Sequence, residues 1–306
     1  MTKVLIATEK PFAKAAVAQM SEICEKAGYE VKLLEKYSQK AELLSAVADV
    51  QAIIIRSDKI DQEVMDAAPQ LKIVVRAGAG YDNVDTAYAK EKGICVMNTP
   101  GQNSNAVAEL AIGLAIYGIR EFFSGNAGGE LRGRTLGLHG YGYVARNVHR
   151  IARAFGMQVK VYTRYSKAQA ASQGLEVTHS LEELYAVSDV VSIHVPARGE
   201  HLKSVSMAVL KQLKKDAILV NTARKEVIDE DDLCQFMTER NDVKYLSDIA
   251  PDCAGRFEQK FKGRYYFTPK KIGAQTGEAN LNAGVAAAEQ IVAFVENGDN
   301  TFQVNK

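Results

Sequence analysis

The chain has 306 residues, of which 47% are hydrophobic and 25% are charged, and its formal net charge at pH 7 is +1. These values are ordinary for a globular protein, and a net charge so close to zero argues against a nucleic acid or a membrane surface as the main partner. No segment contains the roughly 20 consecutive apolar residues that a membrane-spanning helix needs.

The first part of the chain alternates between strand and helix signals. Short apolar runs predict strands, and apolar residues at helical spacing predict the helices between them. In chain order we expect a strand at 3–7, a helix at 12–27, a strand at 31–34, a helix at 41–50, and strands at 52–55, 73–75 and 94–97. This alternation predicts βα units, a parallel sheet and a first compact unit over residues 1–98.

The rest of the chain repeats the pattern after a turn-rich linker at 98–105. It predicts a long apolar helix at 106–123, strands at 135–138, 159–162, 190–195, 217–221, 244–249 and 266–268, and an alanine-rich helix at 279–295. A chain of this length can form two domains with separate cores. We therefore predict an α/β protein with two doubly wound parallel-sheet domains.

The segment from Thr135 to Tyr162 reads as strand, glycine-rich turn, helix and strand. Within it, Gly140-Tyr141-Gly142-Tyr143-Val144-Ala145 fits the dinucleotide-binding pattern. The first glycine allows a tight turn, the second lets backbone N–H groups approach a pyrophosphate, and the small alanine allows close packing of helix and strand. The phosphates would lie at the positive end of the helix that starts near Tyr143. The alternative is an ordinary glycine-rich turn, which the flanking elements disfavour.

The second strand of this segment ends without the acidic residue that usually holds the ribose of NAD. Thr163, Arg164, Ser166 and Lys167 follow it instead. A hydroxyl group followed by basic residues could accept the 2′-phosphate of NADP, whereas a solvated basic loop could still accept NAD through Thr163. Both interpretations stay open.

The cysteines and the amino terminus indicate a cytoplasmic protein. Cys24, Cys95, Cys234 and Cys253 are far apart and lack CxxC spacing, so we expect free thiols and no metal site. The amino terminus enters a predicted strand directly and lacks the apolar region and cleavage site of a signal peptide.

Several segments together resemble the D-2-hydroxyacid dehydrogenase family, in particular its short phosphoglycerate dehydrogenases. In chain order they are KIVVRAGAGYDNVD, NTPGQNSNAVAEL, LGLHGYGYVA, VSIHVP, LVNTARKEVIDE and TPKKIGAQTGEAN. The resemblance implies a flavodoxin-like substrate-binding domain from residues 1–98 and 277–306, a Rossmann-type dinucleotide-binding domain from 99–276, and a cleft between them. It also implies a homodimer formed through the long helix. Longer relatives continue into a regulatory domain, so no serine feedback site of the usual kind is expected.

The implied reaction moves a hydride between the carbon that bears the substrate hydroxyl and a nicotinamide. It needs a cation for the carboxylate and carbonyl oxygens, and an acid/base for the hydroxyl proton. Arg224 matches the family's catalytic arginine, whose planar fork can bind two oxygens, although an arginine on a solvated loop is the alternative. The remaining matches to substrate-binding positions are Arg56 and Ser57 for a phosphate, the backbone of Gly78, Ala79 and Gly80 for the carboxylate, and Asn103.

Other matches concern the cofactor, which we expect to be NAD, with NADP as the alternative. They are Gly140, Tyr141, Gly142, Tyr143, Val144, Thr163, Arg164, His194, Val195, Pro196, Thr222, Ala223, Asp248 and Ala274. Asp248 would face the nicotinamide carboxamide, or it could simply cap the turn after its strand.

The general acid is where the chain departs from the family. Lys271 occupies the place of the usual histidine, and Cys253 the place of its glutamate partner. Asp252 and Glu258 are nearby substitutes, neither of them in register. A carboxylate partner would raise a lysine pKa that is already about 10.4, whereas burial beside Arg224 would lower it. Our hypothesis is that Lys271 transfers the proton without a carboxylate partner. The alternative is an inactive site with lysines on its surface.

The expected activity is oxidation of 3-phosphoglycerate, a small phosphorylated 2-hydroxy acid. An NADP-dependent glyoxylate or hydroxypyruvate reductase is a second enzyme interpretation, favoured by Thr163 and Arg164. A protein of another class, a dinucleotide-binding co-repressor, would also explain the loss of histidine and glutamate. The retained Arg224 argues against it.

Overall fold

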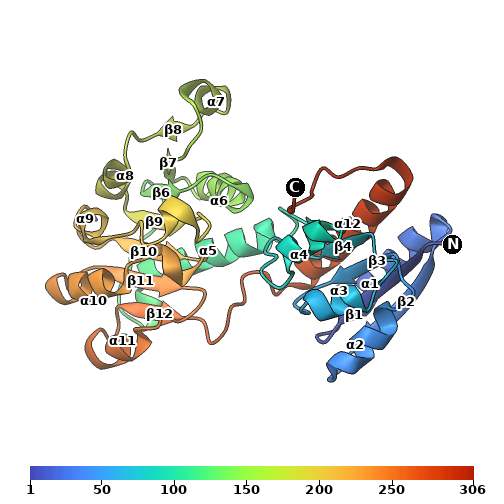
Figure 1. Cartoon of the computed structure of the whole chain (residues 1–306). Helices are drawn as coiled ribbons and strands as arrows, with labels where there is room; N and C mark the ends of the chain where they lie inside the picture. Colours follow the sequence, from blue (N-terminus) through green and yellow to red (C-terminus); the bar gives the residue numbers. More distant parts are fainter. The chain divides into compact units, whose positions relative to one another are not determined.

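The computed structural model describes residues 1–306, except for the side chain of Lys167. The chain forms two compact units. The terminal unit consists of Met1–Asn103 and Gln275–Lys306, and the central unit consists of Ser104–Ala274. In Figure 1 the blue and red ends of the chain therefore belong to the same unit.

The terminal unit contains a five-stranded parallel sheet of order β2-β1-β3-β4-β5. Its strands are β1 (Lys3–Thr8), β2 (Glu30–Glu35), β3 (Ala52–Ile55), β4 (Ile73–Arg76) and β5 (Cys95–Asn98). Helices α1 (Lys14–Lys26) and α12 (Gly277–Asn297) share a hydrophobic core with one face of the sheet. The other face packs against α2 (Lys40–Val47), α3 (Gln62–Asp66) and α4 (Thr86–Glu91). Because both faces are covered, β3 is apolar throughout, and β1 and β4 are apolar except at their ends.

The central unit contains a seven-stranded parallel sheet of order β12-β11-β10-β9-β6-β7-β8. Its strands are β6 (Thr135–His139), β7 (Gln158–Tyr162), β8 (Glu176–Val177), β9 (Val190–Ile193), β10 (Ile218–Asn221), β11 (Lys244–Ser247) and β12 (Tyr265–Phe267). Helices α5 (Ser104–Ile119) and α6 (Tyr143–Ala154) pack on one face. The other face packs against α8 (Leu181–Val187), α9 (Met207–Leu210), α10 (Glu230–Glu239) and α11 (Ala254–Lys260). Between these elements lie α7 (Lys167–Ser172) and the 3₁₀ turns η2 (Gly199–His201) and η3 (Lys225–Val227). The predicted fold class, two parallel-sheet α/β domains, is confirmed.

The carboxyl ends of the central strands are where a ligand is expected in such a sheet. Strand order reverses on either side of β6, because β7 lies on one side of it and β9 on the other. Ligands of open α/β sheets bind at the carboxyl ends of the strands beside such a reversal. The glycine-rich turn after β6 lies there.

The prediction that the helix at 106–123 is continuous was wrong at its carboxyl end. Helix α5 ends at Ile119, and a separate turn, η1 (Glu121–Phe123), follows. Its three residues have φ values of 53°, 56° and 54°, in the left-handed region. The rings of Phe122 and Phe123 each contact Tyr117 edge-on, and Lys244 pairs with Glu121, so tertiary contacts replace the helical ones. None of the helices over the described residues is both long and apolar enough to cross a membrane.

Candidate functional site

The glycine-rich turn between β6 and α6 has the geometry of a phosphate-binding loop. Gly140 has φ of +95°, and a Cβ atom there would lie 2.7 Å from Val195 Cγ1 and 2.9 Å from the His194 carbonyl oxygen. Only glycine fits this position without displacing its neighbours. Gly142 precedes α6, no side chain caps the helix there, and a Cβ at Gly142 would meet only open space. The first N–H groups of α6 are therefore accessible to an anion.

A cavity of about 290 Å³ opens at this turn. Its walls include many of the residues matched to cofactor-binding positions. They are Gly140, Tyr141, Gly142, Thr163, Arg164, His194, Val195 and Pro196. Tyr143 and Val144 begin α6, and the Tyr143 side chain is exposed. His139 and His201, which the sequence interpretation did not include, also line the cavity.

The part of this cavity that is lined by Thr163 and Arg164 carries a hydroxyl group and a guanidinium group. Arg164 is exposed, and its Nη1 lies 4.0 Å from a carboxylate oxygen of Glu200. The Thr163 hydroxyl accepts a hydrogen bond from the Tyr165 backbone N–H at 3.4 Å. The side chain of Lys167 lies outside the described residues. Both a ribose hydroxyl and a 2′-phosphate are chemically compatible with a hydroxyl group beside a guanidinium group.

Two histidines of this wall, His139 and His194, have lowered pKa values. Burial lowers the pKa of His194 to about 3, and it does the same to His139. Nε2 of His194 is buried and has no hydrogen-bond partner among the described residues. The Thr222 hydroxyl, at the carboxyl end of β10, is also buried and has no hydrogen-bond partner within the part of the chain that the structure describes. Unsatisfied buried polar atoms beside an open phosphate turn fit a polar ligand such as a dinucleotide.

Arg224 and Lys271 converge on a single carbonyl group. Lys271 Nζ donates to the Ala223 carbonyl oxygen at 2.6 Å, and Arg224 Nη1 donates to the same oxygen at 3.0 Å. The turn that carries Arg224 is held by Asn221, whose side chain accepts from the Ala223 N–H and donates to the Arg224 carbonyl. The sequence places these cations 47 positions apart, and the fold brings them together.

The pKa of Lys271 is lowered from 10.5 to about 8. Burial of the amine is the main cause, and the positive charge of Arg224 is the second. The carboxylates of Asp248 and Glu226 act in the opposite direction. A lysine with this pKa exists in both protonation states near neutral to mildly alkaline pH, which is what an acid/base catalyst requires.

Asp248 holds the segment that carries Lys271. It is 1% exposed, and its carboxylate accepts from the backbone N–H groups of Ile272 and Gly273, each at 2.8 Å, and from the Thr268 hydroxyl at 2.9 Å. These donors follow β12, so Asp248 holds the segment after β12 and not the turn after the strand that precedes it. Ala274 ends this segment and is half-buried.

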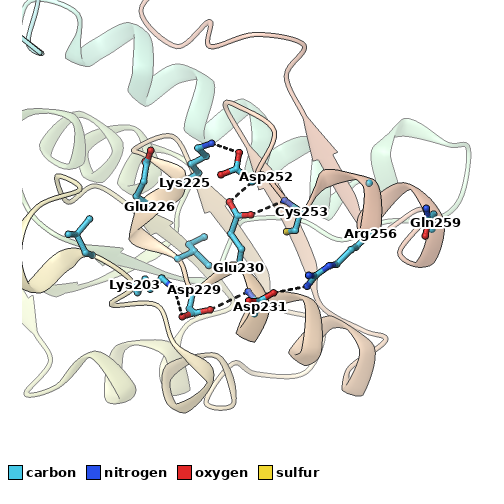
Figure 2. A pocket seen from close by; sticks show the side chains of 13 residues that line it. Lys203, Lys225, Glu226, Asp229, Glu230, Asp231, Asp252, Cys253, Arg256 and Gln259 are labelled. Carbon is cyan, nitrogen blue, oxygen red and sulfur yellow. Dashed lines mark hydrogen bonds and ion pairs between the residues drawn. The ribbon is translucent and has the colours of Figure 1, made fainter. Parts of the chain in front are cut away.

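Asp252 is not brought to Lys271. Its carboxylate pairs with Lys225, at the wall of a second cavity of about 830 Å³ (Figure 2). In Figure 2, Glu230 accepts hydrogen bonds from the backbone N–H groups of Asp252 and Cys253, which fixes the start of α11. Glu226, two positions after Arg224, is instead the second carboxylate that acts on the pKa of Lys271. Sequence reasoning missed Glu226, although its closeness to Arg224 was a usable signal.

In the terminal unit, Arg56 is held firmly at the carboxyl end of β3. Its Nη2 donates to Asn280 Oδ1 at 2.8 Å, and its Nη1 donates to the carbonyl oxygens of Lys10 and Pro11 at 3.2 and 3.1 Å. The guanidinium group also lies over the Phe12 ring, at 5.3 Å from its centre. The neighbouring Ser57 is exposed.

The loop after β4 is held through its carbonyl groups. The Gly78 carbonyl accepts from the Thr99 N–H at 3.0 Å, and the Ala79 carbonyl accepts from the Asn98 side chain at 2.6 Å. Over the described residues, no hydrogen bond is donated by the backbone N–H groups of residues 78, 79 and 80. A loop whose carbonyls are bound and whose amides are available suits a carboxylate ligand.

Arg76 adds a second guanidinium group to this loop. A Cβ atom at Gly78 would lie 1.5 Å from Arg76 Nη1, so the arginine crosses directly over that glycine. Its Nε donates to the Arg56 carbonyl oxygen at 3.0 Å. Asn103, the other predicted substrate contact, is half-buried at the end of this segment of the terminal unit. Arg76 was not predicted from the sequence. Its place at the carboxyl end of β4 corresponds to that of Arg56 directly after β3.

The class of protein follows from the fold together with sequence comparison. The family model described as "D-isomer specific 2-hydroxyacid dehydrogenase, catalytic domain" matches residues 7–305. The chain therefore belongs to the D-isomer specific 2-hydroxyacid dehydrogenases, which are oxidoreductases that depend on a nicotinamide dinucleotide.

Individual relatives carry more than one activity in their names. The chain is 31% identical to glyoxylate reductase of Thermococcus litoralis over 302 residues, which cover 91% of each protein. It is 32% identical to D-3-phosphoglycerate dehydrogenase of Methanocaldococcus jannaschii over 284 residues, which cover 85% of this chain and 54% of that protein. The chain thus spans about half the length of this second relative.

Among solved structures, 3-phosphoglycerate dehydrogenase of Entamoeba histolytica with bound NAD⁺ is similar over the whole chain. The two share 45% sequence identity and a TM-score of 0.88, with 100% of this chain and 99% of the other covered.

Proposed function

We propose that the protein oxidises 3-phosphoglycerate to 3-phosphohydroxypyruvate with NAD, as a D-3-phosphoglycerate dehydrogenase of serine biosynthesis. The observation that carries the choice of substrate is the pair Arg56 and Arg76 beside a loop with available N–H groups. Two guanidinium groups suit a phosphate, and the loop at 78–80 suits the carboxylate. The identity of 45% with the Entamoeba histolytica enzyme supports the same substrate.

In this proposal the central unit holds the cofactor. Residues 140–144 bind the pyrophosphate, Thr163 and Arg164 bind the adenosine ribose, and the ends of β9 and β10 together with Ala274 border the nicotinamide. The cofactor supplies the hydride acceptor when it is bound. The NAD⁺ in the Entamoeba histolytica structure supports NAD over NADP.

Lys271 and Arg224 carry the chemistry. Lys271 in its neutral form takes the proton of the substrate hydroxyl, and its lowered pKa of about 8 makes this form available at mildly alkaline pH. Arg224 holds the oxygen that becomes a carbonyl, because its fork presents several N–H donors to it. Its positive charge also keeps the lysine pKa low. We further propose a cytoplasmic homodimer formed through α5 and the central unit.

The proposal is tested by assaying the purified protein with 3-phosphoglycerate, glyoxylate and unphosphorylated D-2-hydroxy acids, each with NAD and NADP. The highest kcat/KM is expected for 3-phosphoglycerate with NAD. Arg56→Ala should raise KM for 3-phosphoglycerate by about tenfold or more and change glyoxylate turnover little, because only the first substrate has a phosphate. Equal effects on both substrates would contradict the proposed phosphate site.

The second candidate is an NADP-dependent glyoxylate or hydroxypyruvate reductase. It is favoured by Thr163 and Arg164 at the cavity wall and by the match to 91% of the Thermococcus litoralis glyoxylate reductase. A preference for NADP and glyoxylate in the same assay would select it. Absence of turnover with every pair would instead favour the co-repressor-like role.

A further inference from the structure

Asp58 is a buried carboxylate to which the proposed chemistry gives no role. It follows Arg56 and Ser57 at the carboxyl end of β3 and is 1% exposed. Burial of a charged carboxylate is costly unless strong hydrogen bonds compensate for the lost water. The role of Asp58 therefore lies in the groups that donate to it.

The two oxygens of Asp58 bind three different loops. Oδ1 accepts from the Tyr37 hydroxyl at 2.8 Å and from the Glu9 backbone N–H at 2.7 Å. Oδ2 accepts from the Arg56 backbone N–H at 3.1 Å. These donors follow β1, β2 and β3, so a single carboxylate connects the chain after three adjacent strands. Burial and the bond to Asp58 raise the pKa of Tyr37, so its phenol stays a donor at physiological pH.

The same contacts determine where the Arg56 guanidinium group lies. The carbonyl oxygens that accept from Arg56 belong to Lys10 and Pro11, which directly follow the N–H of Glu9 that Asp58 binds. On its other side the Arg56 carbonyl accepts from Asn83 at 3.3 Å as well as from Arg76. Asp58 thus fixes both the backbone of Arg56 and the segment that holds its side chain.

We propose that Asp58 is the positioning residue for the phosphate-binding arginine, and that it sets the affinity for a phosphorylated substrate without touching that substrate. This inference rests on the proposed function, because it assumes that Arg56 binds the phosphate.

The test compares Asp58→Asn with the unsubstituted protein. Asparagine keeps the size of the side chain, but its amide NH₂ must face either the Arg56 N–H or the Glu9 N–H, so one donor loses its acceptor. KM for 3-phosphoglycerate should rise about tenfold, which corresponds to the loss of one hydrogen bond to a charged group. We expect kcat, KM for NAD and turnover of an unphosphorylated D-2-hydroxy acid to change by less than about twofold.

Asp49→Asn is the matched control. Asp49 pairs with Lys3 and Lys32 in the same unit, where Lys3 begins β1, away from the carboxyl ends of the strands. Both substitutions remove a bonded carboxylate, and only Asp58→Asn should raise KM. If Asp58→Asn does not fold, Tyr37→Phe removes one of the three bonds. It should raise KM about twofold to threefold and lower the melting temperature, because the buried carboxylate keeps one donor fewer.

The outcomes separate this inference from the proposed function. An unsubstituted protein that neither binds 3-phosphoglycerate in calorimetry nor turns it over overturns both. The inference alone is overturned if the unsubstituted protein turns over 3-phosphoglycerate normally and Asp58→Asn leaves KM for this substrate unchanged. If Asp58→Asn does not fold, an unchanged KM in Tyr37→Phe has the same meaning. A loss of kcat of equal size on phosphorylated and unphosphorylated substrates would also overturn it, because it would indicate a merely structural role.

Discussion

The lowered pKa of Lys271 predicts a measurable dependence of stability on pH. In the unfolded chain the pKa of a lysine is close to 10.5, and in the folded protein that of Lys271 is about 8. Below pH 8 the amine is protonated in both states, so the folded state carries the full cost of a buried charge. Between pH 8 and 10.5 the folded state releases its proton while the unfolded state keeps it, so stability rises with pH.

The size of this effect follows from the shift. A difference of 2.5 pH units (10.5 minus 8) corresponds to at most about 3 kcal/mol at 1.36 kcal/mol per unit. Lys271→Met removes the titration and keeps most of the side-chain volume. The free energy of unfolding of the unsubstituted protein, minus that of Lys271→Met, should therefore increase by up to about 3 kcal/mol between pH 8 and 10.5.

Urea unfolding of both proteins at several pH values measures this difference, and other titrating groups cancel because both proteins contain them. Lys270 is exposed, and Lys270→Met is the control for the exchange of lysine for methionine in this segment. A difference for Lys271→Met that does not change with pH would refute the explanation of the Lys271 pKa by burial.

Three further predictions concern activity and cofactor binding. Lys271→Ala should lower kcat for oxidation by about 10²–10⁴-fold, measured by initial rates. The control Lys270→Ala should change kcat by less than about twofold. Near-normal turnover in Lys271→Ala would exclude the acid/base role. Gly140→Ala should abolish cofactor binding in fluorescence titration, because the added Cβ would lie 2.7 Å from Val195 Cγ1; retained affinity would show that the turn can open. Asp248→Asn replaces one acceptor oxygen by an NH₂ group, which must face an N–H or O–H group of the Lys271 segment. The value of kcat should therefore fall, and the pH profile of kcat should shift. An unchanged pH profile would mean that Asp248 does not position the lysine.

Much of the fold could be predicted because apolar strands are recognisable in the sequence. The strand predicted at 52–55 has the same bounds as β3. The prediction was possible because a strand buried on both faces is apolar at every position. The end of α5 could not be predicted, because the left-handed turn at Glu121–Phe123 depends on contacts with Tyr117 and with Lys244, which is distant in the sequence. Strand β8 has only two residues and carries no periodic signal.

The candidate site was predictable where a residue type matches a motif, and less so where tertiary packing decides. The glycine turn and the place of Lys271 follow from local sequence. The lowered pKa of Lys271 agrees in direction and cause with the hypothesis made from sequence. The pairing of Asp252 with Lys225 depends on how η3 meets the start of α11, which no local pattern encodes.

The return of α12 to the terminal unit has a consequence for biosynthesis. Residues such as Ala287 and Ile291 complete the core around β1 and β3, so that core lacks one of its covering helices until α12 has left the ribosome. The central unit is contiguous and complete by Ala274. On the ribosome the inserted unit should therefore fold first, and the terminal unit should complete its core only after α12 has been synthesised.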